Sequence, residues 1–283
     1  MKKKIVNWMA AGIFLALGAA ICLPVLMLVS GSLADGQEWM QRTAGYLHDT
    51  QEYIGWRWIP DYPTVEHYQR LLFYSPAFFR LFWNSLGMTG GILLGQLVIA
   101  VPAAWAFAVY RFRGKNLLFS LYVILMLLPF QVTMLSKYLV LQQAGMINTR
   151  WAVVLPAIFS TFPVFLIYRS FAGIPAELLE AARVDGAGEL QSFVRVGLPV
   201  AQGGILAAMI LSFLESWNMM EEPLTFLQDK SLWPLSLYLP EIAMDQAGYA
   251  CGASVITLTV SLFVFAIFHD ALEQGIITSG LKA

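Results

Sequence analysis

Few side chains of this 283-residue sequence could take part in catalysis, and those few are scattered. The histidines and cysteines form no metal-spaced cluster and no CxxC pair: His48, His67, His269, Cys22 and Cys251. No GxxxxGK[ST] phosphate loop exists, because Val109 stands where the pair Gly114-Lys115 would need its first glycine. We therefore expect no catalytic residue, no metal site and no cofactor in this chain.

Other polar side chains could contact a solute, because they stand in or beside long apolar segments. They are Gln96, Gln131, Ser212, Ser216 and Asn218. Their amide and hydroxyl groups suit a hydroxyl-rich solute such as a sugar. The same groups also bridge neighbouring helices inside a membrane, so both interpretations stay open from the sequence.

A polar stretch between two apolar segments, residues 169–198, has the pattern of a short helix with a defined end. Pro175 suits a first helical turn because its fixed φ fits there. Glu177 adds negative charge near the positive end of the helix dipole. Gly186 predicts the end, since glycine enters the left-handed conformation without steric cost. A simple turn needs only a few residues, so this stretch has a further role.

Two apolar faces follow from helical spacing in the same stretch. The first comprises Leu178, Ala181, Ala182 and Asp185. The second predicts another short helix and comprises Leu190, Phe193, Val194, Gly197 and Leu198.

The order of residues in this stretch resembles the signature loop of the membrane subunits of ABC importers. The match is Glu-Ala-Ala, three residues, Gly, nine residues, Val, one residue and Leu-Pro, from Glu180 to Pro199. In that family the loop forms a coupling helix that docks in a groove of the cytoplasmic ATPase. The resemblance implies coupling roles for Glu180, Ala181, Ala182, Asp185, Gly186, Leu198 and Pro199. An ordinary amphipathic surface helix is the alternative, and the fixed spacing argues against it.

Composition independently predicts a membrane protein. Hydrophobic residues make up 58% of the chain and charged residues 12%, whereas a soluble domain carries about 25% charged residues. Repeated apolar runs long enough to cross a bilayer predict an all-α, polytopic fold with six transmembrane helices in a single domain, residues 1–283, which the resemblance implies is a permease domain. The predicted spans are residues 5–30, 81–110, 116–136, 151–168, 199–217 and 249–268. The third is expected to bend near Pro129, and Gly87, Gly91 and Gly95 give the second a small-residue face.

The resemblance extends to other parts of the chain. The segments 128–133 and 142–149 and the C-terminal residues 273–283 are similar to the maltose-type, carbohydrate-importing branch of the same permease family. The resemblance therefore implies the type I ABC importer permease fold.

An outer loop is predicted for residues 31–79, which carry six acidic residues and many aromatic ones. It is either a platform for a substrate-binding protein or an aromatic belt at the membrane interface. Thr64 could cap a short helix in this loop, with Val65, Tyr68 and Leu72 on one face.

The positive-inside rule orients the chain. The predicted inner segments hold ten lysines and arginines and the outer ones seven. We therefore expect both termini and residues 169–198 on the cytoplasmic side of a bacterial or archaeal cytoplasmic membrane.

Together with the composition, the resemblance implies a permease subunit of an ATP-driven, binding-protein-dependent importer, for a carbohydrate, working by alternating access. The resemblance implies a second homologous permease, an ATPase dimer that uses ATP and Mg²⁺, and an extracytoplasmic solute-binding protein. The alternatives are a permease for a non-sugar solute, an ion-coupled secondary transporter, an intramembrane enzyme or a membrane scaffold. An ion-coupled transporter usually buries ionisable groups at mid-membrane depth, and the six predicted spans contain almost none.

Overall fold

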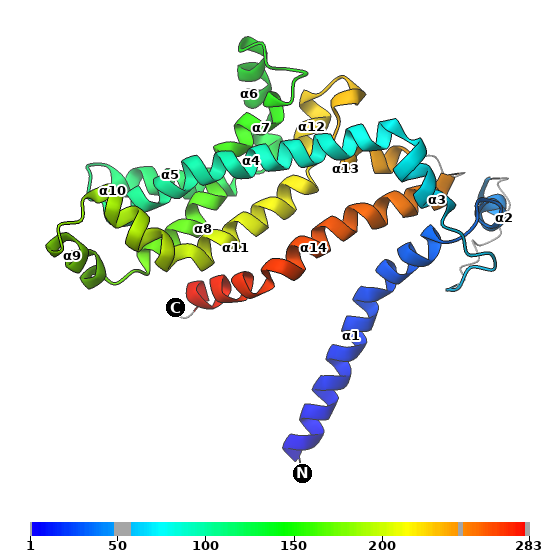
Figure 1. Cartoon of the computed structure of the whole chain (residues 1–283), viewed down its shortest axis with the longest axis horizontal. Helices are drawn as coiled ribbons and strands as arrows, with labels where there is room; N and C mark the ends of the chain where they lie inside the picture. The colour runs from blue at the N-terminus through cyan, green and yellow to red at the C-terminus, as the bar shows by residue number, and fades with distance from the viewer. Residues whose placement is uncertain (1, 48–57, 243–245, 281–283) are drawn as a thin grey trace. The chain divides into compact units, whose positions relative to one another are not determined.

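The computed structural model describes residues 2–47, 58–242 and 246–280, and nearly all of them are helical (Figure 1). Within that part of the chain the β pairing consists of one isolated bridge, between Ala34 and Pro63. The all-α prediction is confirmed. The helices are α1 (Lys2–Ser32), α2 (Gly36–Leu47), α3 (Glu66–Gln69), a π turn (Arg70–Tyr74), α4 (Pro76–Val109), α5 (Lys115–Leu127), α6 (Phe130–Gln143), α7 (Trp151–Ile158), α8 (Thr161–Ala172), α9 (Ala176–Val184), α10 (Glu189–Ser192), a second π turn (Phe193–Gly197), α11 (Leu198–Trp217), α12 (Glu221–Phe226), α13 (Leu235–Tyr238) and α14 (Ala247–Gly280), with short 3₁₀ turns at Lys230–Leu232 and Leu239–Glu241.

The described residues include five helical stretches that are long and apolar enough to cross a bilayer. They are Ala11–Ser32, Pro76–Val109, Arg150–Ala172, Glu189–Trp217 and Ala247–Glu273. A sixth candidate is α5 together with α6, which are bent by 105° relative to each other. The predicted polytopic fold, with up to six spans, is therefore present.

The sharp bend of this third span follows from Pro129, which is the N-cap of α6. A proline disfavours helical geometry in the residue before it, and Leu128 is extended, with ψ 125°. The bend near Pro129 is as predicted, but α6 continues to Gln143, beyond the predicted end at residue 136. Likewise, α14 continues to Gly280, whereas the sixth span was predicted to end at residue 268.

The chain forms two compact units, which are described separately. One comprises Met1–Phe79 and Tyr238–Val260, and the other comprises Arg80–Leu237 and Ser261–Ala283. We call them the first and the second unit.

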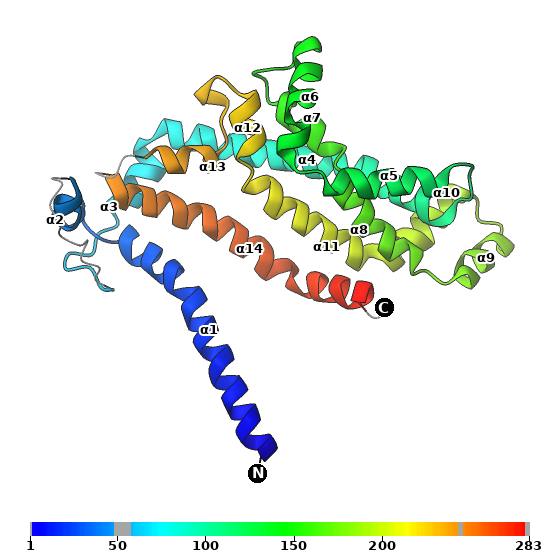
Figure 2. The same ribbon diagram turned by 180° about the vertical axis from the view of Figure 1, so that it is seen from behind.

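The core of the second unit lies where α4, α8 and α11 pack together, with α8 beside α11 in both views (Figures 1 and 2). Its buried side chains include the alanines Ala100, Ala104, Ala201 and Ala208. Such small residues let helix backbones approach closely, which is the usual basis of packing between membrane helices.

Glycines of α4 extend this close packing to α7. A methyl group built on Gly95 would lie 2.4 Å from Ile158 Cδ1, and one on Gly91 would lie 3.4 Å from Val154 Cγ1. The predicted small-residue face is therefore used at these two positions. At Gly87 no atom of the described residues lies within 4 Å of such a methyl group.

In the first unit, the C-terminal end of α1 is tied to the segment that follows it. Trp39 Nε1 donates to the Gly31 carbonyl at 2.8 Å, and Ser30 Oγ donates to the Trp58 carbonyl at 2.7 Å. The first bond caps a carbonyl of the last turn of α1, and the second ties the same turn to Trp58. Trp39 is buried, whereas Tyr62 is 76% exposed, so the aromatic residues of this loop do not all share one environment.

The helix after Thr64 does not bury the face on which Val65, Tyr68 and Leu72 were predicted to lie. Val65 and Leu72 are 55% and 39% exposed, and the buried side chains are His67 and Leu71. The register is set from outside the segment, because His67 packs against Gly248 of α14. Thr64 Oγ1 does accept the Glu66 N–H at 3.1 Å. The predicted outer residues Asp49, Glu52, Tyr53 and Trp56 lie outside the described residues.

Candidate functional site

The predicted coupling loop contains α9, which begins at Ala176. Pro175 is the N-cap, with φ −57° and ψ 135°. It therefore stands one position before the first helical turn in which the sequence analysis placed it. Its φ is helical as expected, but its ψ is extended. Glu177 lies in the first turn as predicted, where its negative charge is favourable.

The end of α9 at Gly186 is confirmed in detail. Gly186 has φ +80°, its N–H donates to the Arg183 carbonyl at 3.0 Å, and the Ala187 N–H donates to the Ala182 carbonyl at 2.9 Å. These two bonds define a Schellman motif, in which a left-handed residue satisfies the last helical carbonyls. Glycine is needed here because a Cβ makes this conformation costly.

The surface of α9 leaves most of the predicted coupling residues accessible. Glu180, Ala181, Asp185 and Gly186 are exposed, and Ala182 is half-buried. The helix is held to the second unit by Leu179, which packs against the core cluster. The helix therefore presents one face outward and uses only a narrow edge for its own anchorage.

Apolar side chains are part of this outward surface. Val184 is 87% exposed, Leu190 74%, Val194 48% and Leu178 45%. Their neighbours include an ion pair between Arg183 and Glu189, with 3.5 Å from Nη2 to Oε1. Exposed apolar groups gathered near charges are typical of a surface that binds a partner.

The second predicted helix of the loop continues without a break into the span. The chain runs through α10, the π turn Phe193–Gly197 and α11, as Figure 1 shows at one end of the second unit. The predicted common face is therefore wrong. The wider π turn shifts the helical phase, so Leu190 and Val194 are exposed while Gly197 is buried. Leu198 begins α11, and Pro199 lies in its first turn.

The π turn packs tightly against α4. A methyl group on Gly197 would lie 2.4 Å from Cζ3 of Trp105. The Trp105 ring also meets the rings of Phe171 in α8 and Phe193 in the π turn, with centroids 5.2 and 5.4 Å away. The loop and the α4–α8–α11 core are therefore in direct contact at Trp105.

A cavity of about 370 Å³ lies elsewhere in the second unit, and three of the predicted solute-path residues line it: Gln96, Ser212 and Ser216. Gln96 is 3% exposed and donates from Nε2 to the Ala157 carbonyl at 3.0 Å. Among the described residues, Gln96 Oε1 and Ser212 Oγ are buried without a hydrogen-bond partner. Buried polar atoms are rarely left unpaired, so these two have unused hydrogen-bonding capacity beside the cavity.

The other two predicted solute-path residues are not among those that line this cavity. Gln131 Nε2 donates to Glu221 Oε1 at 3.0 Å, and Asn218 Nδ2 donates to the Leu214 carbonyl at 2.8 Å. Gln131 thus joins α6 to α12, and Asn218 caps the end of α11.

The cavity also contains three charged residues that were not predicted to line a solute path: Lys137, Glu215 and Glu222. Lys137 Nζ lies 3.8 Å from Glu222 Oε1 and 5.2 Å from the centre of the Phe130 ring. Ionisable residues in apolar segments are functional candidates; Glu215 carried that signal within the predicted span 199–217, whereas Lys137 lies one position beyond the predicted span 116–136. In the described part of the chain, no group of three or more His, Cys, Asp or Glu residues could hold a metal ion.

These features define a class: a helical membrane protein with a cavity in its helical core and an exposed loop that carries apolar side chains. The family model of the binding-protein-dependent transport system inner membrane component matches residues 96–278. This chain belongs to that family of transport permease subunits, which are inner-membrane proteins.

Relatives and a solved structure agree with this assignment. The arabinooligosaccharides transport system permease protein AraQ of Halalkalibacterium halodurans is 27% identical over all of both chains. The sn-glycerol-3-phosphate transport system permease protein UgpE of Brucella melitensis is 31% identical over 77% of this chain and 82% of its own length. A chain of a bacterial ABC transporter involved in the import of the acidic polysaccharide alginate has the same fold, with TM-score 0.81, 19% identity, and coverage of 95% of this chain and 97% of that one.

Proposed function

We propose that this chain, as one permease domain, moves a carbohydrate across the cytoplasmic membrane with energy from ATP hydrolysed in separate subunits. The carbohydrate assignment is supported by the name of the AraQ relative, which matches over the whole chain. The expected partners are a second homologous permease, an ATPase dimer that binds ATP and Mg²⁺, and an extracytoplasmic solute-binding protein. The resemblance noted in the sequence supports each of them.

The observation that carries the coupling proposal is the outward face of α9 and its fixed end at Gly186. Ala181 and the Gly186 turn leave room for a partner to approach the backbone closely. Glu180 and Asp185 lie exposed beside them. Since exposed ion pairs contribute little, the fit of the helix in a groove, more than its charge, holds the ATPase.

Movement of the ATPase subunits would then reach the span through a short path. α9 contacts α10 and the π turn, and the π turn continues through Leu198 and Pro199 into α11. Trp105 passes the displacement to α4, because it meets both Gly197 and Phe193. The proposed orientation places both termini and this loop in the cytoplasm.

The solute would pass through the cavity, which is lined by Gln96, Ser212 and Ser216. Its unpaired Gln96 Oε1 and Ser212 Oγ match the hydroxyl groups of a sugar. Gln131 and Asn218, which bond within the protein, would take part only after those bonds open.

A phosphorylated polyol is a second candidate solute, because the UgpE relative is named for sn-glycerol-3-phosphate. Lys137 is a cation in the cavity, but Glu215 and Glu222 add two carboxylates. The cavity thus has a net negative formal charge, which disfavours an anion. Competition of uptake by neutral oligosaccharides and by glycerol phosphate separates these two solutes.

The coupling proposal is tested by two matched glycine substitutions. Gly186→Ala places a Cβ at φ +80°, whereas Gly188→Ala places one at φ −70°, and no described atom crowds either position. The first change costs roughly 1–2 kcal/mol in the left-handed conformation, and the second does not. We expect Gly186→Ala to reduce recovery of the ATPase with the tagged permease, and Gly188→Ala to leave it unchanged.

Glu180→Lys adds a charge reversal on the exposed face without touching the backbone. Recovery of the second permease serves as the internal control, because it reports that the variant is folded and inserted. If the ATPase is recovered equally with all three variants, or is never recovered with the parent chain, the coupling assignment of this loop is wrong.

A further inference from the structure

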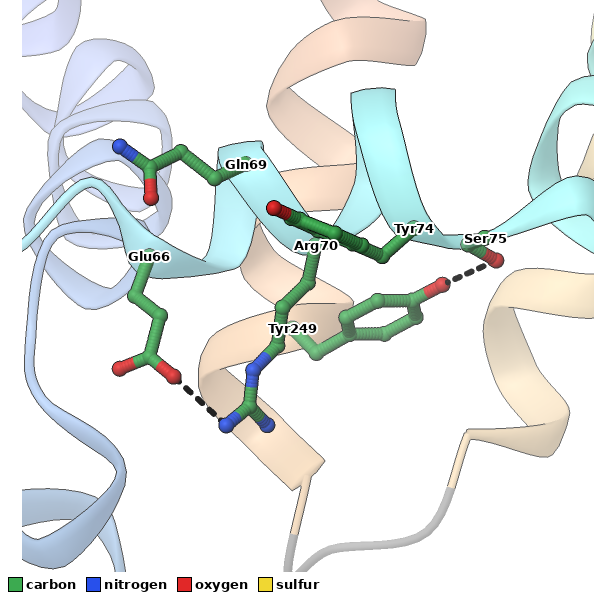
Figure 3. Close-up of a pocket in the computed structure, with 6 residues that line it drawn as sticks. All are labelled: Glu66, Gln69, Arg70, Tyr74, Ser75 and Tyr249. Atoms are coloured by element: carbon green, nitrogen blue, oxygen red, sulfur yellow. Dashed lines mark hydrogen bonds and ion pairs between the residues drawn. The ribbon is translucent and has the colours of Figure 1, made fainter.

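The first unit contains an open pocket of about 470 Å³ that neither the coupling loop nor the solute cavity explains (Figure 3). It is lined by Glu66, Gln69, Arg70, Tyr74, Ser75 and Tyr249. The first five belong to the segment from α3 through the π turn to the start of α4, and Tyr249 lies in the first turn of α14.

The π turn Arg70–Tyr74 places the most exposed of these groups. A π turn is a rare geometry that is frequently found at functional sites. Here the Tyr74 ring is 79% exposed, and the Arg70 side chain is 64% exposed. Both side chains are therefore open to a ligand from solution or from the membrane surface.

The charges of the pocket are balanced. Arg70 Nη2 lies 2.6 Å from Glu66 Oε1, one helical turn away, and Figure 3 shows the Arg70 side chain reaching Glu66 beside the Tyr249 ring. The pocket therefore carries no net formal charge. An anion would have to replace Glu66 on Arg70, whereas a neutral ligand can use the remaining guanidinium donors and the free carboxylate oxygen lone pairs.

The Ser75 hydroxyl is hydrogen-bonded to two neighbouring groups. Its Oγ accepts both the Tyr249 hydroxyl at 3.0 Å and the Phe78 N–H at 3.3 Å. Because a hydroxyl accepts two bonds and donates one, the Ser75 proton remains available to a ligand. Tyr238 bonds to Tyr249, and burial, the nearby Tyr249 and this bond raise the pKa of Tyr238.

We propose that this pocket binds a neutral, hydroxyl-rich glycosyl group. Aromatic rings offer flat apolar contact, and the planar side chains of Arg70, Glu66 and Gln69 offer paired donors and acceptors to neighbouring hydroxyls. The glycosyl group is part of a free oligosaccharide or of a glycolipid headgroup. This inference goes beyond the proposed function, because the pocket shares no residue with the coupling loop or with the solute cavity.

The test uses the full chain in nanodiscs without sugar-based detergent, because a maltoside headgroup would compete for the pocket. Binding of maltotriose and of trigalacturonate is measured by calorimetry. A second set of nanodiscs, identical except for an added diglucosyl lipid, distinguishes a free oligosaccharide from a glycolipid headgroup. If the lipid headgroup occupies the pocket, binding of free maltotriose is lost. We expect the parent chain to bind maltotriose and to bind trigalacturonate more weakly.

Tyr74→Ala is expected to weaken maltotriose binding about tenfold, the upper range for one aromatic contact. The matched control is Tyr62→Ala, because Tyr62 is a similarly exposed tyrosine, at 76%, outside the pocket. Glu66→Gln gives the pocket a net positive charge and is expected to reverse the preference toward trigalacturonate.

Equal effects of Tyr74→Ala and Tyr62→Ala on maltotriose binding would overturn the proposal. The same holds if Glu66→Gln leaves the preference for maltotriose over trigalacturonate unchanged, or if the parent chain in nanodiscs without glycolipid does not bind maltotriose. The Gly186→Ala variant is expected to keep this binding. Failure of ATPase coupling and failure of the pocket are therefore distinguishable.

Discussion

Gly197→Ala is the substitution that tests most directly how the loop meets the span. The new Cβ would lie 2.4, 2.9 and 3.0 Å from Cζ3, Cη2 and Cε3 of Trp105. Real Cβ atoms do not approach other atoms to 2.4 Å, so the ring or the π turn must move by about 1 Å. Trp105 is only 4% exposed and is held by Phe171 and Phe193. Overpacking of such a site typically costs about 1–3 kcal/mol.

The assay has two readouts, thermal stability of the purified permease and ATPase activity of the reconstituted transporter. The control for stability is Gly87→Ala in α4, where no described atom lies within 4 Å of the new Cβ. Alanine is favoured over glycine inside a helix by about 1 kcal/mol, so the control should be neutral or stabilising. Gly197→Ala should lower both stability and solute-stimulated ATPase activity.

A second substitution at the same contact separates packing from other causes. Trp105→Phe removes the outer ring atoms that the new Cβ would meet, so the double variant should recover part of the loss. Residues in contact typically show coupling energies of about 0.5–3 kcal/mol in such a double-mutant cycle. Additive effects of Gly197→Ala and Trp105→Phe, or a Gly197→Ala variant as stable as the control, would refute the assignment of this contact.

Three other changes have expected outcomes. Gln96→Leu keeps the side-chain volume but removes the hydrogen bond to the Ala157 carbonyl. Solute uptake should fall while the complex still assembles. Unchanged uptake would mean that Gln96 only joins α4 to α7. Asn148 has φ +61° and accepts two backbone N–H groups, so Asn148→Ala should lower the melting temperature more than Asn148→Gly, which keeps the conformation. Asp229 caps the 3₁₀ turn Lys230–Leu232, and hydrogen bonds from the N–H and then the hydroxyl of Ser231 lower the pKa of Asp229. The stability that this N-cap contributes should be present above about pH 4, the ordinary range of an aspartate, and be lost as pH falls through the lowered pKa. The melting temperature of Asp229→Asn, measured as pH falls from neutral to below about pH 4, should depend less on pH than that of the parent chain. An equal pH dependence would contradict the stabilising role of the Asp229 N-cap.

The features that sequence predicted well are those set by local chemistry. Gly186 ends α9 because a left-handed residue is needed there, whatever surrounds it. The span segments follow from apolar composition over about 20 residues. Pro129 bends the third span because its ring restricts its neighbour and its own N–H is missing.

The features that sequence missed depend on residues distant in the chain. Spacing alone places Leu190, Val194 and Gly197 on one face, because it assumes regular turns. The π turn changes that phase, so Gly197 is buried while Leu190 and Val194 are exposed. Gly197 is also unremarkable in sequence, since its role depends on Trp105, 92 positions earlier. Lys137 joins the cavity because the bend at Pro129 redirects α6, and its extent is not readable from the proline alone.

In the proposed coupling, the two glycines of the loop have different physical roles. Gly186 allows a backbone conformation, so its replacement changes how α9 ends and, in this proposal, how the ATPase approaches. Gly197 allows a close contact, so its replacement changes how the π turn meets Trp105. Between them, the chain contains Ala187, Gly188, α10 and the π turn, and α10 continues through the π turn into α11 without a break. A displacement of α9 must consequently either move Gly197 against Trp105 or be absorbed by the π turn. The two substitutions distinguish these outcomes. If the π turn absorbs the displacement, Gly186→Ala will impair ATPase coupling and Gly197→Ala will not.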